Sequence, residues 1–277
     1  MNGIAFGQYY PAKSILHKLD PRMKIILALL YIVTSFLCTN VFSFLLLLLS
    51  AVFLILVSRI PMRIIYKSLK AIIFILIFTA VLNIFWTSDT ENAPLFSWWI
   101  INIYKSGLYN AAFIVIRIIS MIIGTGLFLT YTTTPIQLTD GLEQLLAPLK
   151  IIRVPVHEFS MMMTIALRFI PTLIEETDKI MNAQKARGAD FNSGGLVKRA
   201  KALLPVLIPL FASSFRRAGE LATAMECRCY RGDKGRTRMT QLHYKPVDLV
   251  LFLTMLAFGA GVILINVYLF NFLNFLT

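Results

Sequence analysis

Long apolar runs dominate the chain, and most charged residues lie in the segments between them. Each run has close to the roughly 20 residues that an α-helix needs to cross the hydrocarbon core of a bilayer. The pattern predicts an all-α integral membrane protein with about five transmembrane helices, joined by a cytoplasmic coupling region of long amphipathic helices. The predicted spans are residues 23–38, 41–57, 71–86, 108–131 and 247–270.

The loop charges predict how these spans are oriented. Basic residues gather before the first run and after the second, whereas residues 87–107 carry Asp89 and Glu91 against Lys105 alone. Lys and Arg favour the cytoplasmic side, so the N-terminus is expected in the cytoplasm and residues 87–107 outside. An odd number of spans then places the C-terminus outside, as in a multi-pass protein of the cell membrane.

Composition agrees with this interpretation and narrows the function. The chain is 57% hydrophobic and 15% charged, which excludes an ordinary soluble domain. The net charge of +13 reflects clustered basic segments, typical of cytoplasmic loops, and no nucleic-acid-binding signature accompanies it. The chain has no phosphate-binding Gly-rich loop, and its three cysteines and three histidines are not spaced as metal ligands. We therefore expect no catalytic residues, no metal site and no cofactor bound by this chain.

Residues 131–244 differ from both a soluble domain and a set of plain spans, and we divide the chain into 1–130, 131–244 and 245–277. Thr134-Pro135 opens a predicted amphipathic helix at 137–149. Two longer units follow, at 156–189 and 196–230, each apolar at its start and charged at its end. This gradient is typical of helices that leave the membrane or lie on its surface. Neither unit is a clean membrane span, because Arg168 and Pro171 interrupt the first and Pro205, Pro209, Arg216 and Arg217 interrupt the second, although one or both units could also span fully.

Two arginines share one context at the ends of these units. Arg187 lies between Ala186 and Gly188, and Arg228 lies 41 residues later between Cys227 and Cys229. Small neighbours allow a helix end to approach a partner closely, and a guanidinium offers a planar fork of donors. The repeated context predicts two similar docking contacts. The alternative is a pair of solvated arginines on a basic face.

Two further features are open to more than one interpretation. Met161, Met162 and Met163 are either core filling or part of an adaptable surface for several partners. Arg117 lies within the fourth predicted span, where a charge is costly. It is expected either to bond carbonyls or polar side chains such as Asn83, or to line a partner interface.

These motifs together resemble the transmembrane T component of energy-coupling factor transporters, the vitamin and metal uptake systems of prokaryotes. The resemblance covers nearly the whole chain. It rests on residues 16–24, on Thr134-Pro135 through Leu149-Lys150, on residues 167–172, and on the two small-Arg-small helix ends. Residues 226–232 look like the extended form of the second arginine motif that is found where one shared transport module serves several substrate-binding proteins.

The resemblance implies a non-catalytic scaffold in the lipid bilayer. Its residues would contact ATPase subunits, contact a substrate-binding protein, or hold the scaffold together. Two coupling helices would each dock on one of two cytoplasmic ATPase subunits, which bind ATP and Mg²⁺. Arg187 with its neighbours would make the first contact. Arg228 would make the second, although Cys227 and Cys229 replace the Ala and Gly of the family pattern. A membrane-embedded substrate-binding S component would pack on apolar residues, for which we choose Met161, Met162, Met163, Leu203, Leu207 and Leu210. Asp20, Pro21, Arg22 and Arg117 are assigned structural roles.

Two rival functions predict different features. A conventional ABC importer permease forming the substrate path would carry one coupling helix per chain, whereas this chain has two such units. A membrane-embedded transferase would need converging carboxylates. Its only candidates, Glu175 and Glu176, are adjacent on a helix and point about 100° apart.

Overall fold

The computed structural model describes residues 9–12, 14–86, 96–98, 101–191, 195–232 and 242–276. Internal contacts divide the chain into two compact units, Met1–Gln144 with Gln241–Thr277, and Leu145–Thr240. The described part is helical apart from one short antiparallel hairpin, β1 (Phe96–Trp98) with β2 (Ile101–Ile103). The fold class predicted from the sequence is confirmed.

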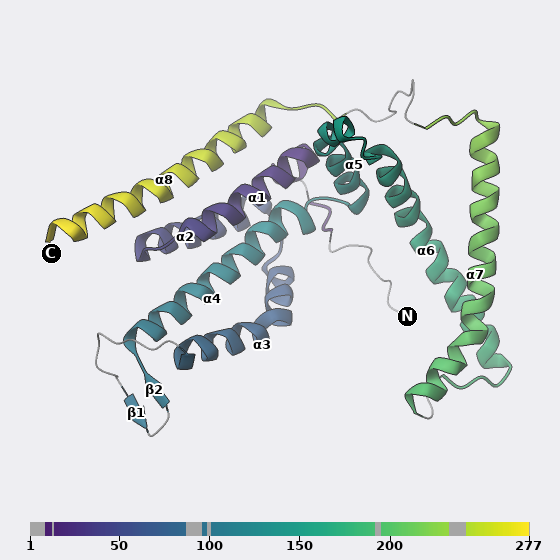
Figure 1. The fold of residues 1–277 in the computed structure, drawn as a ribbon, viewed down its shortest axis with the longest axis horizontal. Coiled ribbons are helices and arrows are strands. Elements are labelled where there is room, and N and C mark those ends of the chain that lie inside the picture. Colours follow the sequence, from purple (N-terminus) through teal and green to yellow (C-terminus); the bar gives the residue numbers. More distant parts are fainter. Residues whose placement is uncertain are drawn as a thin grey trace. The chain divides into compact units, whose positions relative to one another are not determined.

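The first unit holds most of the apolar helices (Figure 1). In chain order its helical elements are η1 (Leu16–Lys18), α1 (Pro21–Leu37), α2 (Val41–Ser58), α3 (Met62–Trp86), α4 (Lys105–Thr125), the π-helical turn η2 (Gly126–Thr130), α5 (Pro135–Leu145) and α8 (Pro246–Leu276). The second unit holds η3 (Ala147–Ile152), α6 (Val156–Ala186) and α7 (Leu196–Cys227).

Four helical stretches of the described chain are long and apolar enough to cross a membrane. They are Val41–Ser58, Met62–Trp86, Lys105–Thr130 and Pro246–Tyr268. The remaining predicted span corresponds to α1, which has 17 residues, near the lower limit for a span. The third helix starts nine residues earlier than the apolar run at 71–86, so the basic residues Arg63 and Lys67 are helical rather than in a loop.

Helix α1 lies at the centre of the first unit, packed against α4 and α8. Its Tyr31 is completely buried and meets the Phe128 ring edge-on, with ring centroids 6.3 Å apart. Gly124 of α4 makes this approach possible. A Cβ added to Gly124 would lie 2.2 Å from the Tyr31 ring, well inside van der Waals contact.

Polar side chains also fix α8 in its C-terminal half, at Asn266. The Asn266 amide donates to the Leu37 carbonyl at 2.6 Å, and its oxygen accepts from the Ser43 hydroxyl at 2.7 Å. The first bond satisfies one of the last carbonyls of α1, which have no partner within their own helix. Both bonds hold α8 to the turn between α1 and α2.

Helix α5 begins with a reciprocal cap. The Gln137 backbone N–H donates to the Thr134 hydroxyl, and the Thr134 N–H donates to the Gln137 side-chain oxygen, both at 3.3 Å. The predicted helix at 137–149 therefore starts two residues earlier, and it ends earlier too, at Leu145. Pro148 accounts for the early end, because it cannot donate to the helix and restricts the residue before it.

Helices α6 and α7 run without a break for 31 and 32 residues. Neither helix is among the described stretches apolar enough to cross a membrane, as expected from Arg168, Pro171 and the prolines and arginines of the second unit. Pro171, Pro205 and Pro209 nevertheless lie inside continuous helices. A proline inside a helix removes one hydrogen bond and frees the carbonyl four residues earlier. The carbonyl freed by Pro209 is that of Pro205, and it accepts a bond from the Gln184 amide of α6 at 3.4 Å. The neighbouring helix thus replaces the bond that the proline removes.

We predict that Gly124→Ala destabilises the protein, because the new methyl group overlaps the buried Tyr31 ring. Overpacking of this kind costs about 1–3 kcal/mol. Gly261→Ala is the matched control, since a Cβ at this glycine of α8 meets nothing within 4 Å. It should leave stability unchanged or raise it slightly through better helix propensity. Thermal unfolding of both variants in detergent measures the difference, and equal effects would contradict the close approach.

Candidate functional site

The first arginine of the repeated motif closes α6. Arg187 is the C-terminal cap residue, and Gly188 follows with a positive φ of 86°. The Gly188 N–H donates to the Lys185 carbonyl at 2.9 Å, and the Ala189 N–H donates to the Gln184 carbonyl at 3.0 Å. This pair of bonds defines a Schellman cap, which turns the chain sharply away from the helix axis.

The second arginine closes α7 in the same way. Arg228 is the cap residue, and Cys229 follows with a φ of 55°. The Cys229 N–H donates to the Glu226 carbonyl at 2.8 Å, and the Tyr230 N–H donates to the Met225 carbonyl at 3.0 Å. The two helix ends therefore share one backbone geometry, with an exposed arginine at the equivalent position of each.

The small residue after each arginine has a backbone role. The left-handed conformation costs a residue with a Cβ about 1–2 kcal/mol, and glycine avoids this cost. Gly188 is suited to the position, whereas Cys229 is one of three non-glycine residues with positive φ in the described chain. Cysteine keeps the side chain small but leaves the second cap strained. We name Arg187 and Arg228, with their small neighbours, the two arginine caps.

An ion pair at the middle of the helix pair joins α6 to α7. One Glu176 carboxylate oxygen accepts from the Arg217 guanidinium at 3.0 Å, and the other accepts from the Ser213 hydroxyl at 2.5 Å. Ser213 is buried, and Glu176 and Arg217 are partly so. Both carboxylate oxygens are therefore engaged, and they are held in place by helix packing. Glu176 is thus committed to structure rather than to chemistry with its neighbour Glu175.

The contacts also show that α6 and α7 run antiparallel. Moving eight residues forward along α6, from Glu176 to Gln184, moves the contact eight residues back along α7, from Ser213 to Pro205. Continued to the end of α7, this register places Arg228 level with Met161 of α6, which is 26 residues before Arg187. At 1.5 Å of rise per residue the two arginine caps are about 39 Å apart along the pair. The C-terminal ends of α6 and α7 therefore lie at opposite ends of the helix pair (Figure 1).

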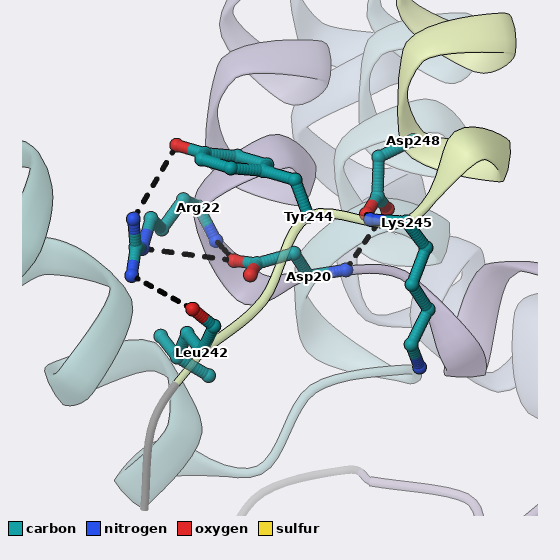
Figure 2. Close-up of polar contacts among 6 residues, drawn as sticks. All are labelled: Asp20, Arg22, Leu242, Tyr244, Lys245 and Asp248. Carbon is teal, nitrogen blue, oxygen red and sulfur yellow. Dashed lines mark hydrogen bonds and ion pairs between the residues drawn. The ribbon is translucent and has the colours of Figure 1, made fainter.

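A second polar cluster joins the start of α1 to the start of α8 (Figure 2). Asp20 caps α1 by accepting from the Arg22 N–H at 2.9 Å, and Pro21 occupies the first helical position. The Arg22 guanidinium donates to the Leu242 carbonyl at 3.4 Å and lies over the Tyr244 ring, 5.2 Å from its centroid. Asp20 and Pro21 thus begin α1, and Arg22 links its first turn to the segment that precedes α8.

Asp248 completes this cluster from the first turn of α8 (Figure 2). It is 1% exposed, and its two oxygens accept from the backbone N–H of Asp20 at 3.1 Å and of Lys245 at 2.7 Å. Nearby, Lys24 is equally buried and donates to the Thr132 carbonyl at 2.7 Å. Buried charges of this kind are costly unless they are bonded, so these contacts fix how α1, α8 and the end of η2 meet.

Arg117 bonds a carbonyl, as one of the two interpretations expects. Its guanidinium donates to the Cys38 carbonyl at the end of α1 at 2.7 Å and lies 5.2 Å from the centroid of the Phe44 ring. The bond satisfies a helix-end carbonyl, and the aromatic face stabilises the charge. This geometry explains how an arginine is tolerated within α4.

The apolar residues chosen for a partner surface are only partly on one face. Met162 and Met163 are exposed and Met161 is half-buried, as expected for consecutive residues pointing about 100° apart. On α7, Leu203, Leu207 and Leu210 have helical spacing and follow one side of the helix. Two of them, Leu203 and Leu207, are exposed at 42% and 41%. The described residues contain no group of three or more His, Cys, Asp or Glu side chains that could hold a metal.

Comparison with known proteins identifies the family. Residues 12–239 match the family described as "CbiQ: Cobalt transport protein", which includes both arginine caps. The chain belongs to the CbiQ/EcfT family. Three relatives bear the name "Energy-coupling factor transporter transmembrane protein EcfT". They come from Clostridium kluyveri (54% identical over 89% of this chain and 91% of the relative), Ruminiclostridium cellulolyticum (51%, over 96% and 98%) and Bacillus subtilis (45%, over 94% and 97%).

Membership of the CbiQ/EcfT family makes this chain a transmembrane component of an energy-coupling factor transporter. Sequence reasoning missed several of the residues that build the structure around the arginine caps. Glu176 was considered only as a weak catalytic candidate, and Asp248 and Gln184 were not singled out. A lone acidic residue at the start of an apolar run, such as Asp248, indicates a bonded polar contact within the protein and could have been singled out from the sequence. Nothing in the sequence pairs Gln184 with the carbonyl freed by Pro209.

We predict opposite effects when the residues after the two arginines are exchanged. Cys229→Gly should stabilise the second cap and Gly188→Cys should destabilise the first, each by about 1 kcal/mol, because only glycine adopts positive φ freely. Amide hydrogen exchange in the last turns of α7 and α6 measures these changes. Gly195→Cys is the control, since Gly195 has an ordinary φ of −68°. Changes of the same sign at both caps would contradict the shared geometry.

Proposed function

We propose that this chain couples ATP hydrolysis by two cytoplasmic ATPase subunits to the movement of a membrane-embedded S component that binds a vitamin or another micronutrient. Each arginine cap docks on one ATPase subunit. The chain itself binds no ATP, Mg²⁺ or transported substrate, and it performs no catalysis. The N-terminus faces the cytoplasm and the C-terminus the outside, following the basic loops.

The observation that carries this proposal is the identical geometry of the two helix ends. An exposed arginine at the cap of each helix, followed by a sharp left-handed turn, gives two equivalent projections for two equivalent grooves. Arginine suits such a contact because its planar fork donates to carboxylates and carbonyls at once. The separation of about 39 Å is large enough for two neighbouring subunits to be engaged simultaneously.

The polar bonds between α6 and α7 suit the transmission of force. Glu176, Ser213 and Arg217 form one junction, and Gln184 with Pro205 forms another close to the first cap. A displacement of one cap is therefore passed to the other helix through bonded side chains rather than through a loose apolar contact. The exposed apolar residues on both helices, among them Met162 and Leu207, provide a surface for the S component.

A conventional permease that forms the substrate path is the rival proposal. It would use one coupling helix per chain and would assemble as a dimer to engage two ATPases. Two equivalent caps on a single chain favour the coupling role instead. Purification of the tagged chain decides between them, because the coupling role requires a separate S component in the complex.

We predict that Arg187→Ala weakens one docking contact and Arg228→Ala the other. The double variant should release the ATPase pair while the S component stays attached. Loss of a desolvated arginine contact typically costs about 2–5 kcal/mol, much of it from partner groups left without a bond. Lys at either position should restore binding only in part, because it keeps the charge and loses the fork. Co-purification of the ATPase subunits and substrate uptake measure both effects.

The control is the double variant Arg199→Ala with Arg216→Ala, two exposed arginines within α7 that are not at a cap. It removes the same charge, so general basic attraction would make it equivalent to the double cap variant and equally sensitive to added salt. The proposal requires the control to retain both ATPase subunits. Equal losses in the two variants would refute docking through the caps.

A further inference from the structure

An apolar cavity of about 390 Å³ lies between α2 and α8, with α1 as its floor. Its walls are almost entirely apolar, and the Tyr31 and Ser50 hydroxyls, 3.4 Å apart, are among the few polar groups in it. The lining residues are Leu27, Tyr31, Leu46, Leu49, Ser50, Phe53, Leu54, Phe128, Leu251, Thr254, Met255 and Phe258. Two helices that cross the membrane form its rim, so its natural contents are hydrocarbon.

A second cavity, of about 300 Å³, follows on the same side of α2. Phe53 lines the apolar cavity and Val57, one helical turn or about 6 Å further on, lines the second. The second cavity differs in chemistry, because Lys18 and Arg59 line it together with Ser14, Ile15 and Leu56. Lys245 adds a third cation nearby, since its ammonium donates to the Lys18 carbonyl at 3.1 Å.

Both cations of the second cavity are exposed side chains. The ion pairs of Arg22 with Asp20 and of Arg217 with Glu176 in the described part of the chain do not include Lys18 or Arg59. Arg59 also has an unusual backbone, with a φ of 54° at the C-terminal end of α2. Glycine is the usual residue at such an end. A basic side chain is itself favourable at a helix C-terminus, so the outlier is the left-handed backbone of a residue with a Cβ, and a functional role is a reasonable inference from it.

We propose that the two cavities together bind one anionic glycerophospholipid. Its phosphate lies with Lys18 and Arg59, and one acyl chain follows α2 into the apolar cavity. The cavities lie in order, charged then apolar, from the end of α2 that adjoins the basic loops towards the middle of the helix. This is the arrangement of a lipid in the cytoplasmic leaflet, where anionic headgroups are attracted to juxtamembrane basic residues. Their volumes suit a small-molecule site of about 300–1,000 Å³.

A lipid explains both cavities, whereas simpler ligands explain only one. A free phosphate or glycerol phosphate would fill the charged cavity and leave the apolar one without an occupant. A neutral lipid would fill the apolar cavity and bring no anionic group to Lys18 and Arg59. Because α8 is held to α1 at two separate points, by Asp248 and by Asn266, an acyl chain between α2 and α8 would bind to walls that are already in place.

The test is lipid binding to the full-length chain, purified with the subunits it retains and measured by native mass spectrometry. Phosphatidylglycerol and phosphatidylcholine with the same acyl chains are added separately, and glycerol phosphate is a third probe. We expect phosphatidylglycerol to bind more tightly than phosphatidylcholine. Removing both charges with Lys18→Gln and Arg59→Gln should weaken phosphatidylglycerol binding about 30-fold, since each charge is worth about fivefold. Phosphatidylcholine binding should not change.

Matched variants separate this site from general attraction to the membrane. Arg63→Gln with Lys67→Gln removes the same charge from exposed positions of α3 that do not line the cavity, and it should have no effect. Thr254→Trp fills the apolar cavity and should weaken the binding of both lipids, whereas Leu253→Trp places the same side chain at a position that does not line it. Should the charge-removing pair fail to fold, Arg59→Gly suits the positive φ and should still weaken phosphatidylglycerol binding about fivefold.

Three kinds of result would overturn the proposal. The first is equal loss of phosphatidylglycerol binding in the Lys18/Arg59 and Arg63/Lys67 variants, which would indicate general basic attraction. The second is equal binding of phosphatidylglycerol and phosphatidylcholine to the unaltered chain. The third is binding of glycerol phosphate as tight as that of the whole lipid, or a Thr254→Trp variant that binds lipid normally, either of which would exclude the acyl chain from the apolar cavity.

Discussion

The carboxylate of Glu176 holds α6 and α7 in one register, and the placement of both arginine caps depends on that register. It accepts bonds from Ser213 and Arg217 on the opposite helix, at a point where Ser213 is buried. Apolar helix packing alone tolerates sliding by a turn, whereas a paired charge in a partly buried place does not, because a slipped register would leave it unbonded. The antiparallel register then sets the caps about 39 Å apart. The coupling proposal needs such a fixed distance.

The caps show how a backbone requirement and a docking requirement are met by the same three residues. The Schellman turn ends each helix at its arginine and directs the following chain away, so the side chain projects from an exposed end. The residue after the arginine must adopt positive φ, which favours glycine, and it must also be small enough for close approach. Cys229 is small and adopts the positive φ, but at the cost in strain that a Cβ imposes there. The departure from glycine therefore affects the stability of the cap more than its shape.

Much of the fold follows from the sequence, because apolar length and helical periodicity are local properties. The starts of α6 and α7 match the predicted units, and both arginines lie at helix ends as expected. What the sequence does not reveal depends on distant residues. Pro209 lies inside a continuous α7, and Gln184, on another helix, bonds the carbonyl that it frees. Likewise, Asp20 was recognised as structural from its motif, but its partner Asp248 lies 228 residues away and no local pattern joins them.

The separation of the two caps is the quantity that tests this account most directly. Spin labels at Lys185→Cys and Glu226→Cys, in a chain with Cys38, Cys227 and Cys229 replaced, occupy equivalent positions one residue inside each helix end. In the antiparallel register 22 residues of helix separate them, so double electron–electron resonance should show one narrow peak corresponding to about 33 Å between backbones. Glu176→Ala should broaden that peak. A broad distribution in the unaltered chain, or a distance near the roughly 10 Å of parallel neighbouring helices, would contradict the account.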